Sequence, residues 1–188
     1  MKYIISGTDR KNSNTLKIAK IVQSLFAKKN ESFEIIDLAE LNLSAMMGPF
    51  YGAEAPAGIQ AAIQKINDSE ALYIVCPEYN GSMPGILKYF IDHWKYPDSF
   101  EFRPVAFCGL GGMFGGLRPV EHLQQVMGYR NAFIYPERIF LTNVWKHIQN
   151  DSLTDSIALG LLEKQVDGFS QFCKALSEHK LDALSRRK

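Results

Sequence analysis

A polar segment with two glycines and two prolines separates an apolar run from a helix pattern. The segment, residues 76–85, contains Glu78, Tyr79 and Asn80, which supply a carboxylate, an aromatic ring and an amide. It follows the apolar run 71–75 and precedes apolar residues at helical spacing, so we expect a buried strand, a loop and a helix. Ligands of open parallel sheets bind at the carboxyl ends of strands. The segment predicts a site for a flat, heteroatom-rich ligand; an ordinary strand-to-helix loop is the alternative.

A second polar loop follows a short apolar run at residues 3–5. The loop, residues 8–15, carries three hydroxyl groups, two asparagine amides and the fixed positive charge of Arg10. It leads into a helix pattern with Ser13 or Asn12 as the expected N-cap, and a helix N-terminus offers free N–H groups to an anion. Together these groups can surround a terminal phosphate. The spacing matches neither GxxxxGK[ST] nor GxGxxG, and a loop that only caps the helix is the alternative.

A third loop is rich in glycine and follows the apolar run 105–110. Residues 111–116 contain four glycines, and a helix pattern begins near Arg118 and Pro119. Glycines remove side chains where a ring could lie flat on the backbone. This loop is a further candidate ligand contact, with a flexible loop as the alternative.

Apolar runs and helix patterns alternate five times, which is typical of a doubly wound α/β sheet. The last predicted strand is interrupted at Pro136 and Glu137, and the last helix is expected to begin near residues 151–152. In a parallel sheet of order 2-1-3-4-5, strands one, three and four are neighbours, with the switch point between one and three. The three loops should therefore converge on one crevice.

The same three loops carry a resemblance to a known family. Residues 77–88 resemble the isoalloxazine-contacting segment of the NADPH-dependent FMN reductases, flavodoxin-like flavoproteins that include azo-, quinone- and chromate-reducing members. Residues 7–15 resemble the family's phosphate loop, and residues 111–119 its third flavin segment. Four positions depart from the pattern. Thr8 replaces the commoner Ser but keeps the hydroxyl, and Asp9 adds a negative charge to the phosphate loop. Gly109 stands where the family often has Ser, and Pro119 where a small residue is more usual.

The resemblance implies a flavodoxin-like five-stranded parallel sheet with helices on both faces, FMN as cofactor and NADPH or NADH as hydride donor. Quinones, azo compounds, free flavin or metal oxyanions would be the small-molecule acceptors. The competing hypothesis is a flavodoxin-like electron carrier or a flavin-binding partner protein without turnover of its own. The candidate cofactor-binding residues are Thr8, Arg10, Ser13, Asn14, Thr15, Pro77, Glu78, Tyr79, Asn80, Gly81, Gly111, Gly112, Met113 and Gly115.

The resemblance also implies a homodimer or homotetramer. An apolar stretch between the second strand and second helix is a candidate contact between subunits, and a cover for the flavin edge or a local core contact are the alternatives. Its apolar residues are Met46, Met47, Phe50 and Tyr51.

Composition narrows the remaining classes. A chain of 188 residues with a net charge of +1 and no basic stripe suits one globular domain and argues against a nucleic-acid surface or a strongly acidic carrier. Three scattered cysteines predict buried thiols in a reducing compartment. The chain begins without a signal-peptide pattern and has no apolar run of membrane length, so we expect a cytoplasmic protein. Residues 179–188 are expected to form a solvated tail.

Side chains for hydrolytic or metal chemistry are poorly placed in the sequence. Ser6 and Ser82 have no obvious base, and the GxSxG motif is absent. The four histidines lack metal-ligand spacing and are expected on helix faces or at the surface.

Overall fold

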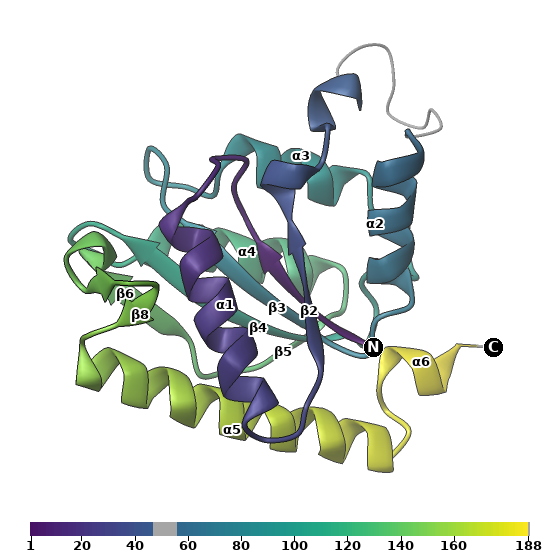
Figure 1. The fold of residues 1–188 in the computed structure, drawn as a ribbon. Coiled ribbons are helices and arrows are strands. Elements are labelled where there is room, and N and C mark those ends of the chain that lie inside the picture. The colour runs from purple at the N-terminus through teal and green to yellow at the C-terminus, as the bar shows by residue number, and fades with distance from the viewer. Residues whose placement is uncertain (47–55, 188) are drawn as a thin grey trace.

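A parallel β-sheet forms the centre of the fold, with helices on both of its faces (Figure 1). The computed structural model describes residues 1–46 and 56–187. The strands of the sheet are β1 (Lys2–Ser6), β2 (Phe33–Asp37), β3 (Leu72–Pro77), β4 (Pro104–Gly111), β5 (Phe133–Ile134) and β6 (Ile139–Thr142). Their order is β2-β1-β3-β4-β5, with β6 also paired to β4. The predicted flavodoxin-like order 2-1-3-4-5 is confirmed.

Six α-helices accompany the sheet in the described part of the chain. They are α1 (Asn14–Ala27), α2 (Ala57–Asn67), α3 (Gly85–Asp92), α4 (Leu117–Tyr129), α5 (Ser156–Glu178) and α6 (Ala183–Arg186). Helices α1 and α5 pack on one face of the sheet, and α2, α3 and α4 pack on the other. Neighbouring residues of one strand face opposite cores: Ile4 lies with α1 and α5, whereas Ile5 lies with α2 and α3. The strands are therefore buried on both faces, which is why they appear in the sequence as unbroken apolar runs.

The last strand position is shared by two short strands, as the sequence predicts. β5 pairs with Pro104 and Val105 at the start of β4, and β6 pairs with residues 108–111 at its end. The interruption contains Pro136, which has no N–H to donate to a ladder. This split carries the chain to the carboxyl end of β4, next to the glycine-rich loop.

The start of the last helix differs from the prediction. Residues 148–153 contain a small hairpin of β7 (Ile148–Gln149) and β8 (Ser152–Leu153), and α5 begins only at Ser156. The Asp155 carboxylate accepts hydrogen bonds from the Ile157 and Ala158 N–H groups at 3.0 and 3.1 Å. Asp155, rather than a residue near 151, is therefore the N-cap.

The expected solvated tail is wrong for its central part. Asp182 and Ala183 are 7% and 6% exposed, and the Asp182 carboxylate accepts hydrogen bonds from the N–H groups of Leu184 and Ser185 at the start of α6. Arg187 donates to the Asp68 carboxylate at 3.2 Å. The end of the chain is thus docked beside the end of α2.

Two sequence predictions remain, one on the subunit contact and one on membrane spans. Of the four residues of the candidate subunit contact, Met46, Met47, Phe50 and Tyr51, the last three lie outside the described residues, and the contact stays a prediction. Among residues 1–46 and 56–187, no helix combines the length and the apolar composition needed to span a bilayer.

Candidate functional site

The loop after β1 runs directly against β3. The Gly7 N–H donates to the Val75 carbonyl at 2.9 Å, and a Cβ built on Gly7 would lie 2.9 Å from both that oxygen and the Leu87 Cδ2. A side chain at position 7 would therefore push the loop away from the sheet. Thr8, the next residue, is fully buried at the carboxyl end of β1.

Ser13 caps α1, which settles the choice between Ser13 and Asn12. Its hydroxyl oxygen accepts a hydrogen bond from the Leu16 N–H at 3.1 Å. The N–H groups of Asn14 and Thr15 have no hydrogen-bond acceptor in the described part of the chain. Two free N–H groups at a helix N-terminus, with the exposed Arg10 nearby in the loop, favour an anion at this place. The Thr15 side chain is buried on the core side of α1.

The loop after β3 folds as a tight hairpin. Tyr79 and Ser82 exchange N–H···O hydrogen bonds of 2.9 and 3.1 Å, with Asn80 and Gly81 at φ values of 51° and 80°. Positive φ at both central residues is the type I′ turn that Asn-Gly favours. The hairpin gives Tyr79 a fixed backbone, from which its side chain reaches the first loop.

A hydrogen bond joins the first and second loops. The hydroxyl groups of Tyr79 and Thr8 lie 2.8 Å apart, and the Arg10 N–H donates to the same Thr8 oxygen at 3.3 Å. The Arg10 guanidinium lies 5.9 Å from the centre of the Tyr79 ring, within cation–π range. When Tyr79 donates to Thr8, the Thr8 hydroxyl accepts two hydrogen bonds and keeps its own proton for a third partner.

The glycine-rich loop packs on backbone atoms. A Cβ on Gly109 would lie 2.6 Å from the Gly116 carbonyl oxygen, and Gly116 itself adopts φ 82° at the N-terminus of α4. Gly115, at φ 57°, is packed against the backbone of Phe140 and Leu141 in β6. These contacts give Gly115 a packing role, and they explain why position 109 has no side chain.

Gly111, Gly112 and Met113 form the outer part of this loop. Met113 is 80% exposed, and Gly112 is open apart from the Trp145 ring, 3.8 Å from a built Cβ. A Cβ on Gly111 would lie 3.2 Å from the Glu78 Cβ, so the third loop touches the second here. The Glu78 N–H also donates to the Leu110 carbonyl at 2.9 Å. All three loops therefore meet, as the sheet order predicts.

An ion pair crosses from the second loop to the third. Arg118 Nη1 lies 3.0 Å from Glu78 Oε1, and the guanidinium lies 4.5 Å from the centre of the Phe114 ring. The sequence reading treated Glu78 as a ligand contact and did not include Arg118 in the site. The two residues are 40 positions apart, so no local pattern reveals the pair.

Ser82 has a partner that the sequence reading missed. Its hydroxyl lies 2.8 Å from Nδ1 of His122 on α4. From the sequence, no base was expected for Ser82, and the histidines were expected on helix faces or at the surface. His122 does lie on a helix, but it also ties the hairpin to α4.

In the described residues, no group of three or more His, Cys, Asp or Glu side chains is arranged to hold a metal ion.

The three thiols are all buried. Burial raises the pKa of Cys108 and of Cys173 to about 12, and that of Cys76 well above its ordinary value. All three cysteines are unpaired. They are therefore poor nucleophiles, and the site chemistry must come from elsewhere.

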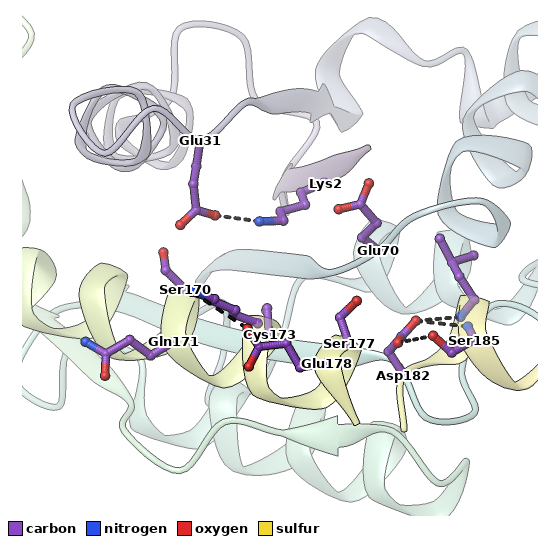
Figure 2. A pocket seen from close by; sticks show the side chains of 12 residues that line it. Lys2, Glu31, Glu70, Ser170, Gln171, Cys173, Ser177, Glu178, Asp182 and Ser185 are labelled. Atoms are coloured by element: carbon purple, nitrogen blue, oxygen red, sulfur yellow. Dashed lines mark hydrogen bonds and ion pairs between the residues drawn. The ribbon is translucent and has the colours of Figure 1, made fainter. Parts of the chain in front are cut away.

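A separate cavity of about 640 Å³ lies at the opposite end of the sheet, where the strands begin (Figure 2). Lys2 and Glu31 face it as an ion pair of 2.5 Å, opposite Cys173 and Ser177 of α5. Its charged side chains are largely paired with one another. Because ligands of such sheets bind at the carboxyl ends of the strands, this cavity is not the predicted site.

Comparisons with known proteins place the chain in a family. Residues 3–146 match the family described as NADPH-dependent FMN reductase. A 2-hydroxy-1,4-benzoquinone reductase of a Burkholderia species is 32% identical over 130 residues, 67% of this chain and 69% of the relative. An FMN-dependent NADPH-azoreductase of Staphylococcus aureus is 30% identical over 141 residues, 72% of this chain and 73% of the relative.

Solved structures show the same fold. FerB, a flavoenzyme NAD(P)H:(acceptor) oxidoreductase from Paracoccus denitrificans, has a TM-score of 0.73 at 24% identity, covering 93% of this chain and 97% of FerB. A flavodoxin from the domain Archaea has a TM-score of 0.62 at 15% identity, covering 93% and 99%. The fold is flavodoxin-like. The chain belongs to the NADPH-dependent FMN reductase family, and it is an FMN-dependent NAD(P)H reductase.

Proposed function

We propose that this reductase passes electrons from NADPH through FMN to quinones or azo compounds, the acceptor classes named for its relatives. The observation that carries the proposal is the direct contact of three loops at the carboxyl ends of β1, β3 and β4. The hydroxyl groups of Tyr79 and Thr8 are hydrogen-bonded to each other. The Glu78 N–H donates to the Leu110 carbonyl, and the Glu78 side chain packs against Gly111. Bound FMN supplies the two-electron chemistry, and the residues around it bind and orient.

The first loop is the proposed phosphate site. Support comes from its donors: the free N–H groups of Asn14 and Thr15, the hydroxyls of Ser13 and Thr8, and the Arg10 guanidinium. A hydroxyl that accepts one hydrogen bond can still donate its own proton, so Ser13 can cap α1 and bind phosphate together. A phosphate monoester carries nearly two charges and suits this set of donors.

The second and third loops are the proposed site for the flavin ring. Gly81, Gly111 and Gly112 present backbone without side chains, and Pro77 ends β3 beside them. Met113 and Asn80 are exposed at the loop tips and can close over a bound ring. Because the cofactor carries the redox chemistry, this site requires no nucleophile and no paired acid and base.

The test is an absorption spectrum of the FMN-reconstituted protein under anaerobic conditions. We expect NADPH to bleach the absorption bands of the flavin. An added quinone should restore these bands as fast as the enzyme turns over in the steady state. An Arg10→Ala variant loaded at the same FMN concentration serves as the control for cofactor binding. A protein that binds FMN but is not bleached by NADPH would contradict the proposal and favour an electron carrier.

Two further proposals concern the whole protein. A cytoplasmic location is supported by the three buried cysteines, which are free thiols rather than disulfides. A homodimer or homotetramer is proposed from the family resemblance. Light scattering at micromolar concentration tests the assembly, and a monomer would contradict it.

A further inference from the structure

One charged side chain spans the second and third loops, whose shared edge we call the mouth of the proposed flavin site. Arg118 lies in the first turn of α4. Its Cδ is 3.7 Å from the place that a Cβ would occupy on Gly81. Its Nη1 lies 3.0 Å from Glu78 Oε1. The guanidinium thus reaches from the third loop across the second, beside the residues proposed to hold the flavin ring.

Two contacts fix the position of the guanidinium. Glu78 holds one edge of it, and the Phe114 ring lies 4.5 Å from its central carbon. Arg guanidinium groups stack on aromatic faces and bind carboxylates along a fixed edge, so both contacts restrict the same plane. Phe114 is itself half exposed. The guanidinium is therefore held in a defined place, next to the carboxylate that balances its charge.

The two partners differ in their access to solvent. The Arg118 side chain is 50% exposed, whereas that of Glu78 is only 15% exposed and lies against Gly111, with Oε2 3.7 Å from a built Cβ. Without Arg118, a sheltered carboxylate would face the mouth alone. Without the charge of Glu78, a solvent-facing guanidinium would be unpaired. The sum of the two charges is zero, and either change alters it by one unit in opposite directions.

We infer that the Glu78–Arg118 pair sets the charge preference for acceptors, by keeping the mouth neutral and so favouring uncharged planar molecules over anionic ones. This inference rests on the proposed function, because it places the acceptor at the mouth formed by these loops. Arg118 and Glu78 act here as specificity-determining residues. They are given no role in the electron transfer itself.

The test compares two redox-inert ligands of nearly equal shape, naphthalene-2-sulfonate and naphthalene-2-sulfonamide. Their dissociation constants are measured by calorimetry with the oxidised, FMN-loaded protein at low salt. Relative to wild type, Arg118→Gln should lower the affinity for the sulfonate more than the affinity for the sulfonamide. Glu78→Gln should raise the affinity for the sulfonate relative to that for the sulfonamide. A unit charge near an exposed site changes the ratio by roughly three- to tenfold.

The double variant Glu78→Gln/Arg118→Gln is the decisive control, because it restores zero charge. Its ratio of the sulfonate and sulfonamide dissociation constants should return to within about twofold of wild type, whether or not the variant binds FMN more weakly. A Lys29→Gln variant changes the net charge at the ion pair between Lys29, just after α1, and Asp167 of α5, and should leave the ratio unchanged. The shifts should shrink as salt rises, since exposed charges are screened.

Loss of a structural contact gives a different pattern. If the pair only stabilises the loops, both single variants should move the ratio in the same direction or leave it unchanged, and the double variant should be the worst of the three. Either result would overturn the inference. Turnover with 1,4-naphthoquinone and its 2-sulfonate then provides a second readout on the same variants. Failure of wild type to be bleached by NADPH would contradict the proposed function, whereas an unchanged ratio in a working reductase contradicts only this inference.

Discussion

The hydroxyl groups of Tyr79 and Thr8 lie 2.8 Å apart and join two loops that are 71 residues apart in the chain. Thr8 belongs to the proposed phosphate loop, and Tyr79 to the proposed ring-binding hairpin. A cofactor that contacts both loops depends on their relative position. This bond therefore links the two ends of the proposed FMN site.

Tyr79→Phe should weaken FMN binding roughly two- to tenfold, because the loss of one neutral hydrogen bond costs about 0.5–1.5 kcal/mol. Thr8→Val removes the same bond from the other side. In a double-mutant cycle the two losses should be less than additive, since the first change already breaks the bond. Flavin fluorescence titration measures the affinities, with Thr8→Ser, which keeps the hydroxyl, as the control. Fully additive losses would mean that the two residues act independently.

Arg10→Ala should weaken FMN binding at least tenfold while changing riboflavin binding little. The reason is that a charge-assisted hydrogen bond to the phosphate is worth about 1.5–3 kcal/mol, and riboflavin has no phosphate. Lys11→Ala, which removes an exposed charge next to it, is the matched control. Equal losses for FMN and riboflavin would show that Arg10 does not bind the phosphate.

Gly109→Ala should destabilise the protein by about 1–3 kcal/mol, because its Cβ would lie 2.6 Å from the Gly116 carbonyl oxygen, a backbone atom with no room to move. Gly160→Ala is the matched control: nothing lies within 4 Å of its Cβ in α5. That variant should gain up to about 1 kcal/mol from the better helix propensity of Ala. Urea denaturation measures both changes. Equal stability of the two variants would mean that the glycine-rich loop can shift.

Asp182→Ala should reduce stability by about 0.5–2 kcal/mol through loss of the α6 cap. Burial of Asp182 opposes its charged form, but hydrogen bonds from Ser185 and Leu184 outweigh burial and lower its pKa. A lowered carboxyl pKa stabilises the fold above the unfolded pKa of about 3.9, and this gain is lost as pH falls through the folded pKa. The difference between variant and wild type should therefore be full above about pH 5 and shrink below pH 4. Urea denaturation across this range measures it, and a gap that widens toward low pH would contradict the sign.

Local patterns in the sequence predicted the features that depend on nearby residues. Ser13 is one of the two predicted caps of α1, and a loop was predicted at Asn80 and Gly81. The hairpin found there was not predicted, although the Asn-Gly pair specifies it locally. The last helix was misplaced because acidic and hydroxyl residues occur in pairs at 151–152 and again at 155–156, and both pairs resemble an N-cap. Only packing of the β7–β8 hairpin decides between them.

Contacts between distant residues were beyond a local reading. The Glu78–Arg118 and Ser82–His122 pairs each join positions 40 apart, across the same two segments. The docked end of the chain depends on Arg187 meeting Asp68, 119 positions away. Such pairs depend on the three-dimensional arrangement of α2, α4 and the loops, which spacing along one chain does not encode.

The last prediction is kinetic and follows from the three loops forming one site. If the ring-binding hairpin and the glycine-rich loop cover one face of the flavin, donor and acceptor must use the other face in turn. The oxidised donor, NADP+, should then leave before a quinone enters, with the two electrons taken from NADPH held in the enzyme between the two events. Double-reciprocal plots with NADPH varied at several fixed quinone concentrations should give parallel lines.

A bulky side chain in the glycine-rich loop gives this scheme a control. Gly112→Val adds volume beside Trp145, 3.8 Å from a built Cβ, and should lower the rates for all acceptors together while the lines stay parallel. Equal effects are expected because an open face selects acceptors by stacking more than by shape. Lines that intersect, or bleaching of the flavin by NADPH only when quinone is already bound, would show that both substrates occupy the site together. The alternating mechanism would then be wrong, whereas the proposal that the three loops form the site would still stand.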